Sequence, residues 1–170
     1  MTGARLRDRA QLFCLTVERT VLLPVLASLG ITPTQFAAMR YLKLNPGRCV
    51  SDLAEALHSS RPAAANLSDR LVRQGLACRH EDAGDRRRVK LQLTPEGLEA
   101  YARVVQGTDG WFAAIAQAMG PDELGLLVRG VDAFVAAALA TGEAPDVCRR
   151  CGLEHDSACP AAGSDPPAVP

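Results

Sequence analysis

Two groups of side chains in this sequence of 170 residues have types and spacings that support chemistry. The first group is polar and mainly cationic and falls in two short segments: Ser60, Arg61, Asn66, Arg70 and Arg73, then Asp85, Arg86, Arg87 and Arg88. Arginine donates paired hydrogen bonds to guanine and asparagine pairs with adenine, although most contacts in such interfaces are made to phosphate. This group therefore predicts an interface with double-stranded DNA.

The second group lies near the C-terminus, in the spacing C-x2-C-x3-H-x3-C, and consists of Cys148, Cys151, His155 and Cys159. Three thiolates and one imidazole are a sufficient ligand set for tetrahedral zinc. The same thiols also suit an iron–sulfur cluster or a reversible disulfide. A flexible, cysteine-bearing end is a further interpretation, favoured by the A-A-G-S-D-P-P-A-V-P segment that follows.

A helix-turn-helix is predicted to position the first five polar side chains. Ser51 is expected to cap one short helix, and Ser59 or Ser60 to cap the next. In the second helix Leu67 and Leu71 lie one turn apart and face inward, which leaves the arginines and the asparagine facing outward.

A β-hairpin is predicted to carry the second segment. Strands are expected at residues 76–80 and 89–93, and the E-D-A-G-D-R-R-R run between them is too polar for a core. A helix-turn-helix followed by a basic hairpin is a winged helix, whose second helix enters the major groove while the hairpin reaches phosphates or the minor groove. Ordinary helix packing and a solvated loop would explain each segment separately, but outward arginines on both favour DNA.

Three stretches resemble the MarR family of bacterial transcription regulators. They are L-x-x-L-G-I-T-P-x-Q-F at 26–36, S-R-P-A-A-A-N-L-S-D-R-L-V-R-Q-G-L at 60–76 and D-R-R-R-V-K-L-Q-L-T-P-E-G at 85–97. The resemblance extends over about residues 5–141 in consistent order and spacing. It implies that Asp85 pairs with Arg87 and braces that arginine for the DNA backbone or the minor groove.

The same resemblance implies homodimers that bind near-palindromic operators. Many members of the family release DNA when a small phenolic or other aromatic ligand, or an oxidant, is present. In the family the effector pocket lies where the helix containing Phe36, Met39, Tyr41 and Leu42 meets the winged domain and the first helix. Plain core packing is the other interpretation of these residues.

The charge distribution agrees with a DNA interface although the net charge is zero. Residues 1–60 hold 7 basic and 4 acidic side chains, residues 61–90 hold 8 and 4, and residues 91–170 hold 4 and 11. Phosphate attraction acts over roughly 10 Å at ordinary salt, so a local positive field outweighs the neutral total.

Helices are predicted on both sides of the winged unit. The first, at about residues 6–29, is expected to kink or divide at Pro24. The second, at about 32–44, begins with Thr32 as its cap and Pro33 in its first turn, and one bent helix at 94–119 begins in the same way with Thr94 and Pro95. A last helix is expected at about 121–139. The broad apolar face of the last helix predicts, with the first helix, a two-fold dimer interface, and an intrachain core is the alternative.

The predicted fold class is mainly α with a small β-hairpin wing, a winged helix-turn-helix attached to a helical dimerisation region. Four parts are expected along the chain. Residues 1–49 form N-terminal helices for dimerisation and the pocket, 50–93 the winged DNA-binding domain, 94–141 the C-terminal dimerisation helices, and 142–170 the cysteine-containing tail with a disordered end.

A cytoplasmic protein without a membrane segment is expected. Val21–Leu29 is too short to span a bilayer and is broken by Pro24, and the N-terminal arginines are not followed by a signal-peptide core. In the cytoplasm six cysteines argue for thiols or metal ligands. Of these, the isolated Cys14, Cys49 and Cys78 are expected to be ordinary core residues. Cys14 has an alternative interpretation, because its Q-L-F-C run resembles the Q-L-C stretch that carries the reactive cysteine in the hydroperoxide-sensing branch of the MarR family, although it lies nearer to Gly30 than in that branch.

The leading hypothesis is a homodimeric transcription regulator of MarR type, a repressor released by a small aromatic ligand or an oxidant. The alternative is a metal- or redox-dependent small enzyme or sensor centred on the C-terminal Cys/His cluster. The sequence shows no paired general acid and base near that cluster, Glu154 alone is weak evidence for catalysis, and a fully ligated zinc leaves no open position for substrate. A third hypothesis is a protein-binding winged helix without DNA affinity.

Overall fold

The computed structural model describes residues 3–81 and 89–141. It is mainly helical with one small antiparallel sheet, which confirms the predicted fold class. The elements in chain order are α1 (Gly3–Val17), a π-helical turn (Glu18–Leu22), α2 (Leu23–Ser28), α3 (Pro33–Leu44), β1 (Arg48–Cys49), α4 (Val50–Ala56), α5 (Arg61–Arg73), β2 (Ala77–Glu81), β3 (Val89–Leu93), α6 (Pro95–Ala118) and α7 (Pro121–Ala140).

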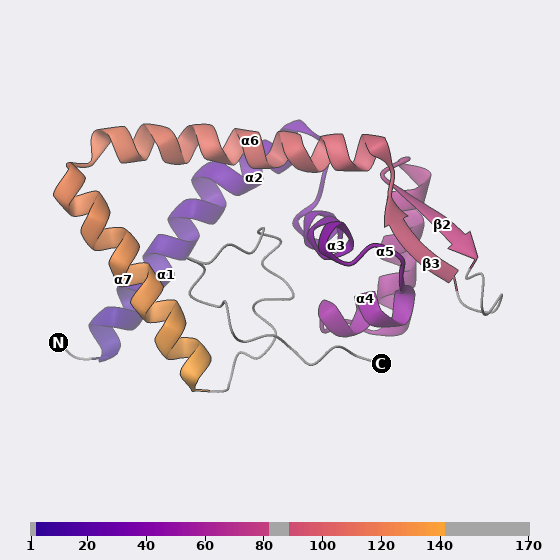
Figure 1. The fold of residues 1–170 in the computed structure, drawn as a ribbon, viewed down its shortest axis with the longest axis horizontal. Helices are drawn as coiled ribbons and strands as arrows, with labels where there is room; N and C mark the ends of the chain where they lie inside the picture. The colour runs from indigo at the N-terminus through magenta and orange to yellow at the C-terminus, as the bar shows by residue number, and fades with distance from the viewer. Residues whose placement is uncertain (1–2, 82–88, 142–170) are drawn as a thin grey trace.

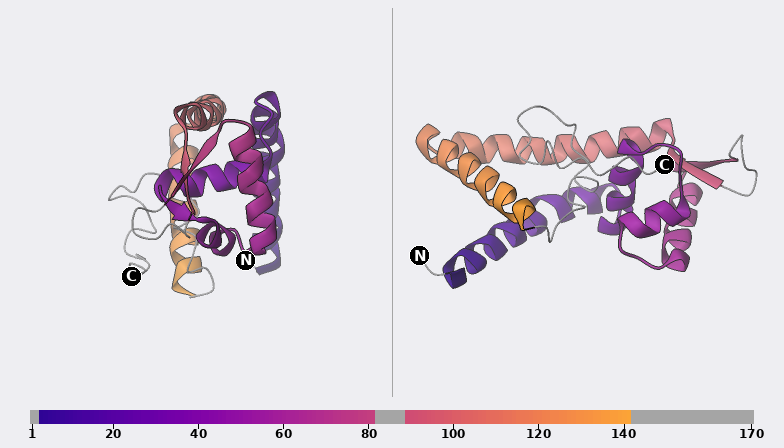
Figure 2. Two further views of the ribbon diagram at one scale, coloured as in Figure 1. Left: turned by 90° about the vertical axis from the view of Figure 1, so that its right-hand side faces the viewer. Right: turned by 60° about the horizontal axis from the view of Figure 1, so that its bottom comes forward.

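Helix α6 runs along the long axis of the molecule and joins its two ends (Figure 1). At one end, α3, α4, α5 and the sheet form the winged unit. At the other end, α7 and the start of α1 extend away from α6, and the second view in Figure 2 shows the same separation. Helix α6 is continuous from Pro95 to Ala118, which confirms that one helix, and not two, occupies the predicted range 94–119.

The first helical segment continues through Pro24 because a π-helical turn precedes it. The turn covers Glu18–Leu22, and Pro24 then stands in the first turn of α2. Proline has no amide hydrogen and its ring crowds the preceding turn, so a locally wider turn accommodates it without ending the helix. The helical path therefore changes geometry before Pro24, and the chain turns away only at Gly30, whose φ is +66°.

The caps of α3 and α5 agree with the sequence, and the cap of α4 does not. Thr32 accepts from the amide of Gln35 at 3.2 Å, and Ser60 accepts from the amide of Ala63 at 3.3 Å. Ser51 lies inside α4, so its predicted role as cap is wrong. The carboxylate of Asp52 instead accepts from the amide of Cys49 at 3.0 Å. A charged acceptor near the start of a helix forms the stronger hydrogen bond and also complements the helix dipole.

The sheet has three strands in the order β1–β3–β2, one more than the predicted hairpin. β2 and β3 pair antiparallel from Ala77 opposite Leu93 to Glu81 opposite Val89. β1 adds two residues, with Arg48 opposite Leu91. The sequence did not indicate β1, because two residues show no alternation.

One hydrophobic core joins the winged unit to the first half of α6. Its fully buried side chains come from six elements and include Leu26, Met39, Leu42, Leu53, Leu71, Leu91 and Val104. Phe36 of α3 stacks on Tyr101 of α6 with ring centroids 5.5 Å apart. Phe36, Met39, Tyr41 and Leu42 are all buried in this core, which agrees with the core-packing interpretation of these residues.

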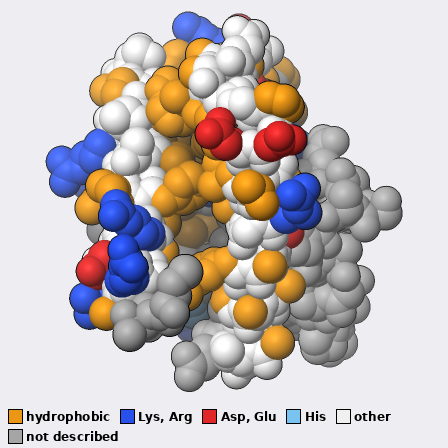
Figure 3. Space-filling view, turned by 90° about the vertical axis from the view of Figure 1, so that its left-hand side faces the viewer, with side chains coloured by type: hydrophobic (Ala, Val, Ile, Leu, Met, Phe, Trp, Pro, Cys, Tyr) orange, Lys and Arg blue, Asp and Glu red, His pale blue; other side chains and the backbone are white. Residues whose placement is uncertain are grey.

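Beyond Val104 the molecule exposes a large apolar surface, here called the end face. None of the residues of α1 or α7 is buried, and neither is any residue of α6 after Val104. Exposed apolar side chains on these helices include Leu12, Phe13, Phe112, Ile115, Leu126, Val131 and Phe134. Figure 3 shows apolar side chains gathered in the hollow between two ridges at this end.

One helical stretch in the described residues, Gly3–Ser28, is long and apolar enough to cross a membrane by length and composition. Its best window has a mean hydropathy of 1.4 and is 11% buried. From the sequence, the apolar run Val21–Leu29 is expected to be broken by Pro24. The stretch Gly3–Ser28 is longer than that run because the helical path continues through Pro24. A single such helix is weak evidence for a membrane span, and Glu18 and Arg19 interrupt its apolar character.

Candidate nucleic-acid interface

Helix α5 carries a stripe of polar side chains on the side opposite its buried face. Asn66, Arg70 and Arg73 follow one another at spacings of four and three residues, and all three are exposed. The buried face consists of Ala64, Leu67, Ser68 and Leu71. Because side chains at these spacings share one side of a helix, the three polar groups form one surface. This surface is called the α5 stripe below.

The other two predicted residues on this helix lie at its start. Arg61 is the first residue of α5 and is exposed, but five positions separate it from Asn66, so it lies off the stripe. Ser60 is also exposed, and its hydroxyl oxygen is already engaged as the helix cap. The structure therefore brings Asn66, Arg70 and Arg73 together and leaves Ser60 and Arg61 at the N-terminal edge of the surface.

The arginines of the stripe have no acidic partner in the described part of the chain. The nearest acid along the helix, Asp69, forms an ion pair with Arg79 of β2. Both of these side chains are 41% exposed, so solvent screens the pair and its contribution to stability is small. Its consequence for the site is that Asp69 does not neutralise Arg70 or Arg73.

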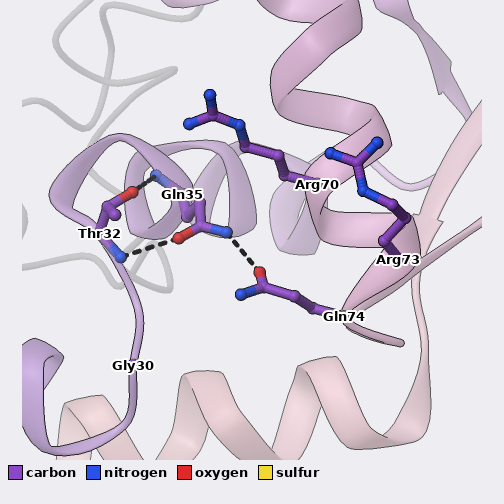
Figure 4. A pocket seen from close by; sticks show the side chains of 6 residues that line it. All are labelled: Gly30, Thr32, Gln35, Arg70, Arg73 and Gln74. Atoms are coloured by element: carbon purple, nitrogen blue, oxygen red, sulfur yellow. Dashed lines mark hydrogen bonds between the residues drawn. The ribbon is translucent and has the colours of Figure 1, made fainter.

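A cavity of about 340 Å³ adjoins the stripe, lined by Gly30, Thr32, Gln35, Arg70, Arg73 and Gln74. Figure 4 shows Arg70 and Arg73 reaching from α5 while Thr32 and Gln35 approach from the N-terminal end of α3. Gln35 is 4% exposed, and its amide oxygen accepts from the backbone N–H of Thr32 at 2.9 Å. Its Nε2 donates to the side-chain oxygen of Gln74.

Sequence reasoning missed the contribution of Gln35 and Gln74 to this surface. The spacing T-x-x-Q at residues 32–35 is a capping-box pattern and would have indicated the bond between Thr32 and Gln35. The contact between Gln35 and Gln74 joins residues 39 positions apart and has no local signal.

The wing residues Asp85, Arg86, Arg87 and Arg88 lie outside the described residues, as does the Cys/His cluster at Cys148, Cys151, His155 and Cys159. The strands on either side of the wing segment end at the paired residues Glu81 and Val89. Within residues 3–81 and 89–141, no group of three or more His, Cys, Asp or Glu side chains is placed to hold a metal ion.

The isolated cysteines differ from the expected buried core residues. Cys14 is exposed on α1, whereas Cys49 and Cys78 are half-buried. The expectation failed for Cys14 because α1 extends away from the core and packs little of its surface within this chain. The sulfur of Cys78 lies 3.1 Å from Nε2 of His80, on the same face of β2.

Comparison with known sequences identifies regulators of transcription. The MarR family model matches residues 29–88. The transcriptional regulator FarR of Neisseria gonorrhoeae is 33% identical over 104 residues, which cover 61% of this chain and 71% of that protein. The transcriptional repressor MdtR of Bacillus subtilis is 29% identical over 120 residues, which cover 71% of this chain and 77% of MdtR.

Comparison with solved structures gives the same fold. Rv1404 from Mycobacterium tuberculosis matches with a TM-score of 0.71 and 25% identity, covering 81% of this chain and 95% of that one. A MepR mutant from Staphylococcus aureus bound to an oligodeoxyribonucleotide matches with a TM-score of 0.62 at 22% identity, covering 81% and 99%. NadR in complex with 4-hydroxyphenylacetate matches with a TM-score of 0.54 at 27% identity, covering 79% and 93%.

The curated relatives are named as regulators and repressors, and not as enzymes, which disfavours the metal- or redox-dependent enzyme considered from sequence. The exposed polar surface of α5, the winged fold and the match to FarR over most of its length lead to one conclusion: the chain belongs to the MarR family and is a transcriptional regulator.

Proposed function

We propose that this regulator is a homodimeric repressor that binds near-palindromic operators in double-stranded DNA. The α5 stripe enters the major groove, where Asn66 reads base edges and the arginines contact bases or phosphates. Arg86, Arg87 and Arg88 of the wing contact the backbone or the minor groove, and Asp85 orients one of them. The proposal depends above all on the exposed, unneutralised α5 stripe. Two of the known proteins support it, because MdtR is named a repressor and the MepR mutant was solved with DNA.

The homodimer is supported by the end face. A surface with this many large apolar side chains is unusual on a monomer and is typical of a permanent interface. Two-fold pairing through α1, α6 and α7 would place two α5 helices against successive major grooves, about 34 Å apart. We assign residues 1–49 to dimerisation and the effector pocket, residues 50–93 to DNA binding, residues 94–141 to dimerisation and residues 142–170 to a cysteine-containing tail. A DNA-binding regulator of this kind acts in the cytoplasm.

A small molecule or an oxidant would release the repressor from its operator. The NadR complex supports a small aromatic acid as one class of effector, because that protein was solved with 4-hydroxyphenylacetate. We also propose zinc for the C-terminal Cys/His cluster, since its four side chains match the ligands of a closed structural zinc site.

Selection of bound duplexes from random sequence tests the proposed function. The protein should enrich a sequence with two related half-sites, and its affinity should fall steeply as salt rises because each phosphate contact releases counterions. A protein-binding winged helix would enrich no sequence and would show no salt-dependent binding to duplex DNA.

A further inference from the structure

The cavity beside the C-terminal half of α5 is lined by hydrogen-bond donors and positive charge, and none of the six residues around it is acidic. Two of the six are Arg70 and Arg73, whose guanidinium groups have no partner in the described residues. Like charges at this spacing on one helix destabilise each other, so an anion between them would relieve the repulsion. A guanidinium group also holds phosphate and carboxylate oxygens through paired hydrogen bonds.

The glutamine pair adds a further donor whose orientation is fixed. The oxygen of Gln35 accepts from the backbone of Thr32, so the Nε2 of Gln35 must face Gln74. Gln74 consequently turns its oxygen toward Gln35. Its own Nε2 carries two N–H donors and has no partner among the described residues. Gln35 is therefore a positioning residue, and Gln74 lines the cavity as a donor.

We propose that this cavity binds one backbone phosphate of duplex DNA, at the wall of the major groove that α5 enters. The inference rests on the proposed function and extends the DNA interface from α5 to the N-terminal end of α3. Helix geometry supports it, because the seven-residue step from Asn66 to Arg73 corresponds to a rise of about 10 Å along the helix axis. The major groove is about 12 Å wide, so when Asn66 faces base edges, Arg73 and Gln74 reach the phosphates beside the groove.

The cavity also has room for a hydrated phosphodiester. Its volume of about 340 Å³ is many times the roughly 30 Å³ that one water molecule occupies in the liquid. A free anion such as inorganic phosphate has the same chemistry as the backbone group. The experiment must therefore separate a phosphate that belongs to DNA from one that does not.

Neutralisation of single phosphates tests the proposal. Selected operator duplexes are made with one methylphosphonate at each backbone position in turn, and their affinities for the full-length protein are measured by fluorescence anisotropy. For the unmodified protein, one position in each half-site should lose about tenfold in affinity, as expected for a lost charge-assisted hydrogen bond. In Arg73→Gln the same methylphosphonate should cost less than about twofold, because its partner is already missing.

Gln74→Glu is the second variant, and Arg5→Gln is the matched control. Gln74→Glu keeps the side-chain length but replaces a donor with an anionic acceptor, so it should weaken DNA binding at least as much as Arg73→Gln. Arg5 is exposed on α1, at the opposite end of the molecule from α5. Because α1 belongs to the proposed dimer interface, gel filtration first establishes that Arg5→Gln is dimeric, and the methylphosphonate profile of that dimer should be unchanged.

Three results would contradict the proposal in different ways. If the losses of binding free energy caused by Arg73→Gln and by a methylphosphonate were additive at every backbone position, Arg73 would not contact any one phosphate in particular. If inorganic phosphate, compared with chloride at equal ionic strength, stabilised the free protein but not Arg73→Gln, and no position were coupled, the cavity would hold a free anion. Failure of the unmodified protein to bind any duplex would overturn the proposed function itself.

Discussion

At the scale of single residues, Arg70 and Arg73 of α5 are distinguished because neither forms an ion pair with an acidic side chain of the described residues. Asp69, one position before Arg70, is engaged by Arg79 of β2. Arg70 and Arg73 thus keep their full charge for an external anion, whereas Arg61 at the helix start lies off the stripe. We therefore expect Arg70 and Arg73 to contribute more to DNA affinity than Arg61 does.

Arg87 lies outside the described residues, and its place in the wing and its role are predicted from the sequence and the family resemblance. Arg87→Ala should weaken operator binding by several-fold or more and reduce the salt slope by about 1, because one phosphate or minor-groove contact is lost. Anisotropy titrations at several salt concentrations measure both quantities. Gel filtration should show an unchanged dimer, and unchanged affinity would remove Arg87 from the interface.

The C-terminal cluster gives a separate prediction. Purified protein should contain about one zinc per chain, and Cys148→Ser should lose most of it, since a closed tetrahedral site needs all four ligands. Elemental analysis after dialysis against a weak chelator measures the metal. Cys78→Ser is the matched control, because Cys78 lies on β2 rather than in the cluster. Metal-free wild-type protein would exclude the zinc site.

At the scale of elements, α6 determines how the winged unit is attached to the rest of the molecule. Its cap, Thr94, accepts from the amide of Gly97 at 3.0 Å and donates its hydroxyl to the backbone oxygen of Gly75. Gly97 packs directly against the backbone at Leu76, between α5 and β2. The start of α6 is therefore held against the end of α5 by backbone contacts.

Gly97→Ala should destabilise the protein because the added Cβ would stand 1.9 Å from the backbone oxygen of Leu76, which must then move. We expect the Tm to fall by about 5 °C or more. Gly110→Ala in the same helix meets nothing within 4 Å and should raise the free energy of unfolding by up to about 1 kcal/mol. Thermal unfolding at one protomer concentration compares the two, and equal Tm values would contradict the close contact.

At the scale of the whole molecule, apolar surface is divided between a core and the end face. The core lies in the winged unit and the first part of α6, from Leu26 to Val104. The end face lies on α1, the second half of α6 and α7. In the homodimer that we propose, this region would gain its burial from the second chain, so folding and dimerisation should be linked.

Phe134→Asp places a carboxylate in the end face, where the phenylalanine is 51% exposed in the single chain. A buried, unpaired charge is strongly unfavourable, so the variant should be monomeric at micromolar concentration and lose at least about tenfold in operator affinity. Light scattering after gel filtration measures the mass. Phe134→Leu keeps the surface apolar and should remain dimeric. A dimeric Phe134→Asp would place the interface elsewhere.

The sequence by itself determined most of the helices and the two hairpin strands, and it separated the polar from the apolar side chains of α5. Capping residues with prolines behind them located α3, α5 and α6, and the alternation from Val89 to Leu93 located β3. Apolar spacing in α5 also separated its buried face from its arginines. These features are local, because a helix cap and the repeat of apolar residues along a helix or strand depend on residues that lie close together in the sequence.

Only the tertiary structure decided how these elements meet. It paired Arg48 and Cys49 of β1 with Leu91 and Lys90 of β3. It also brought Gln35 to Gln74 across 39 positions and so formed the cationic cavity. Contacts of this kind depend on the packing of separate helices around one core, and no short stretch of sequence contains that information.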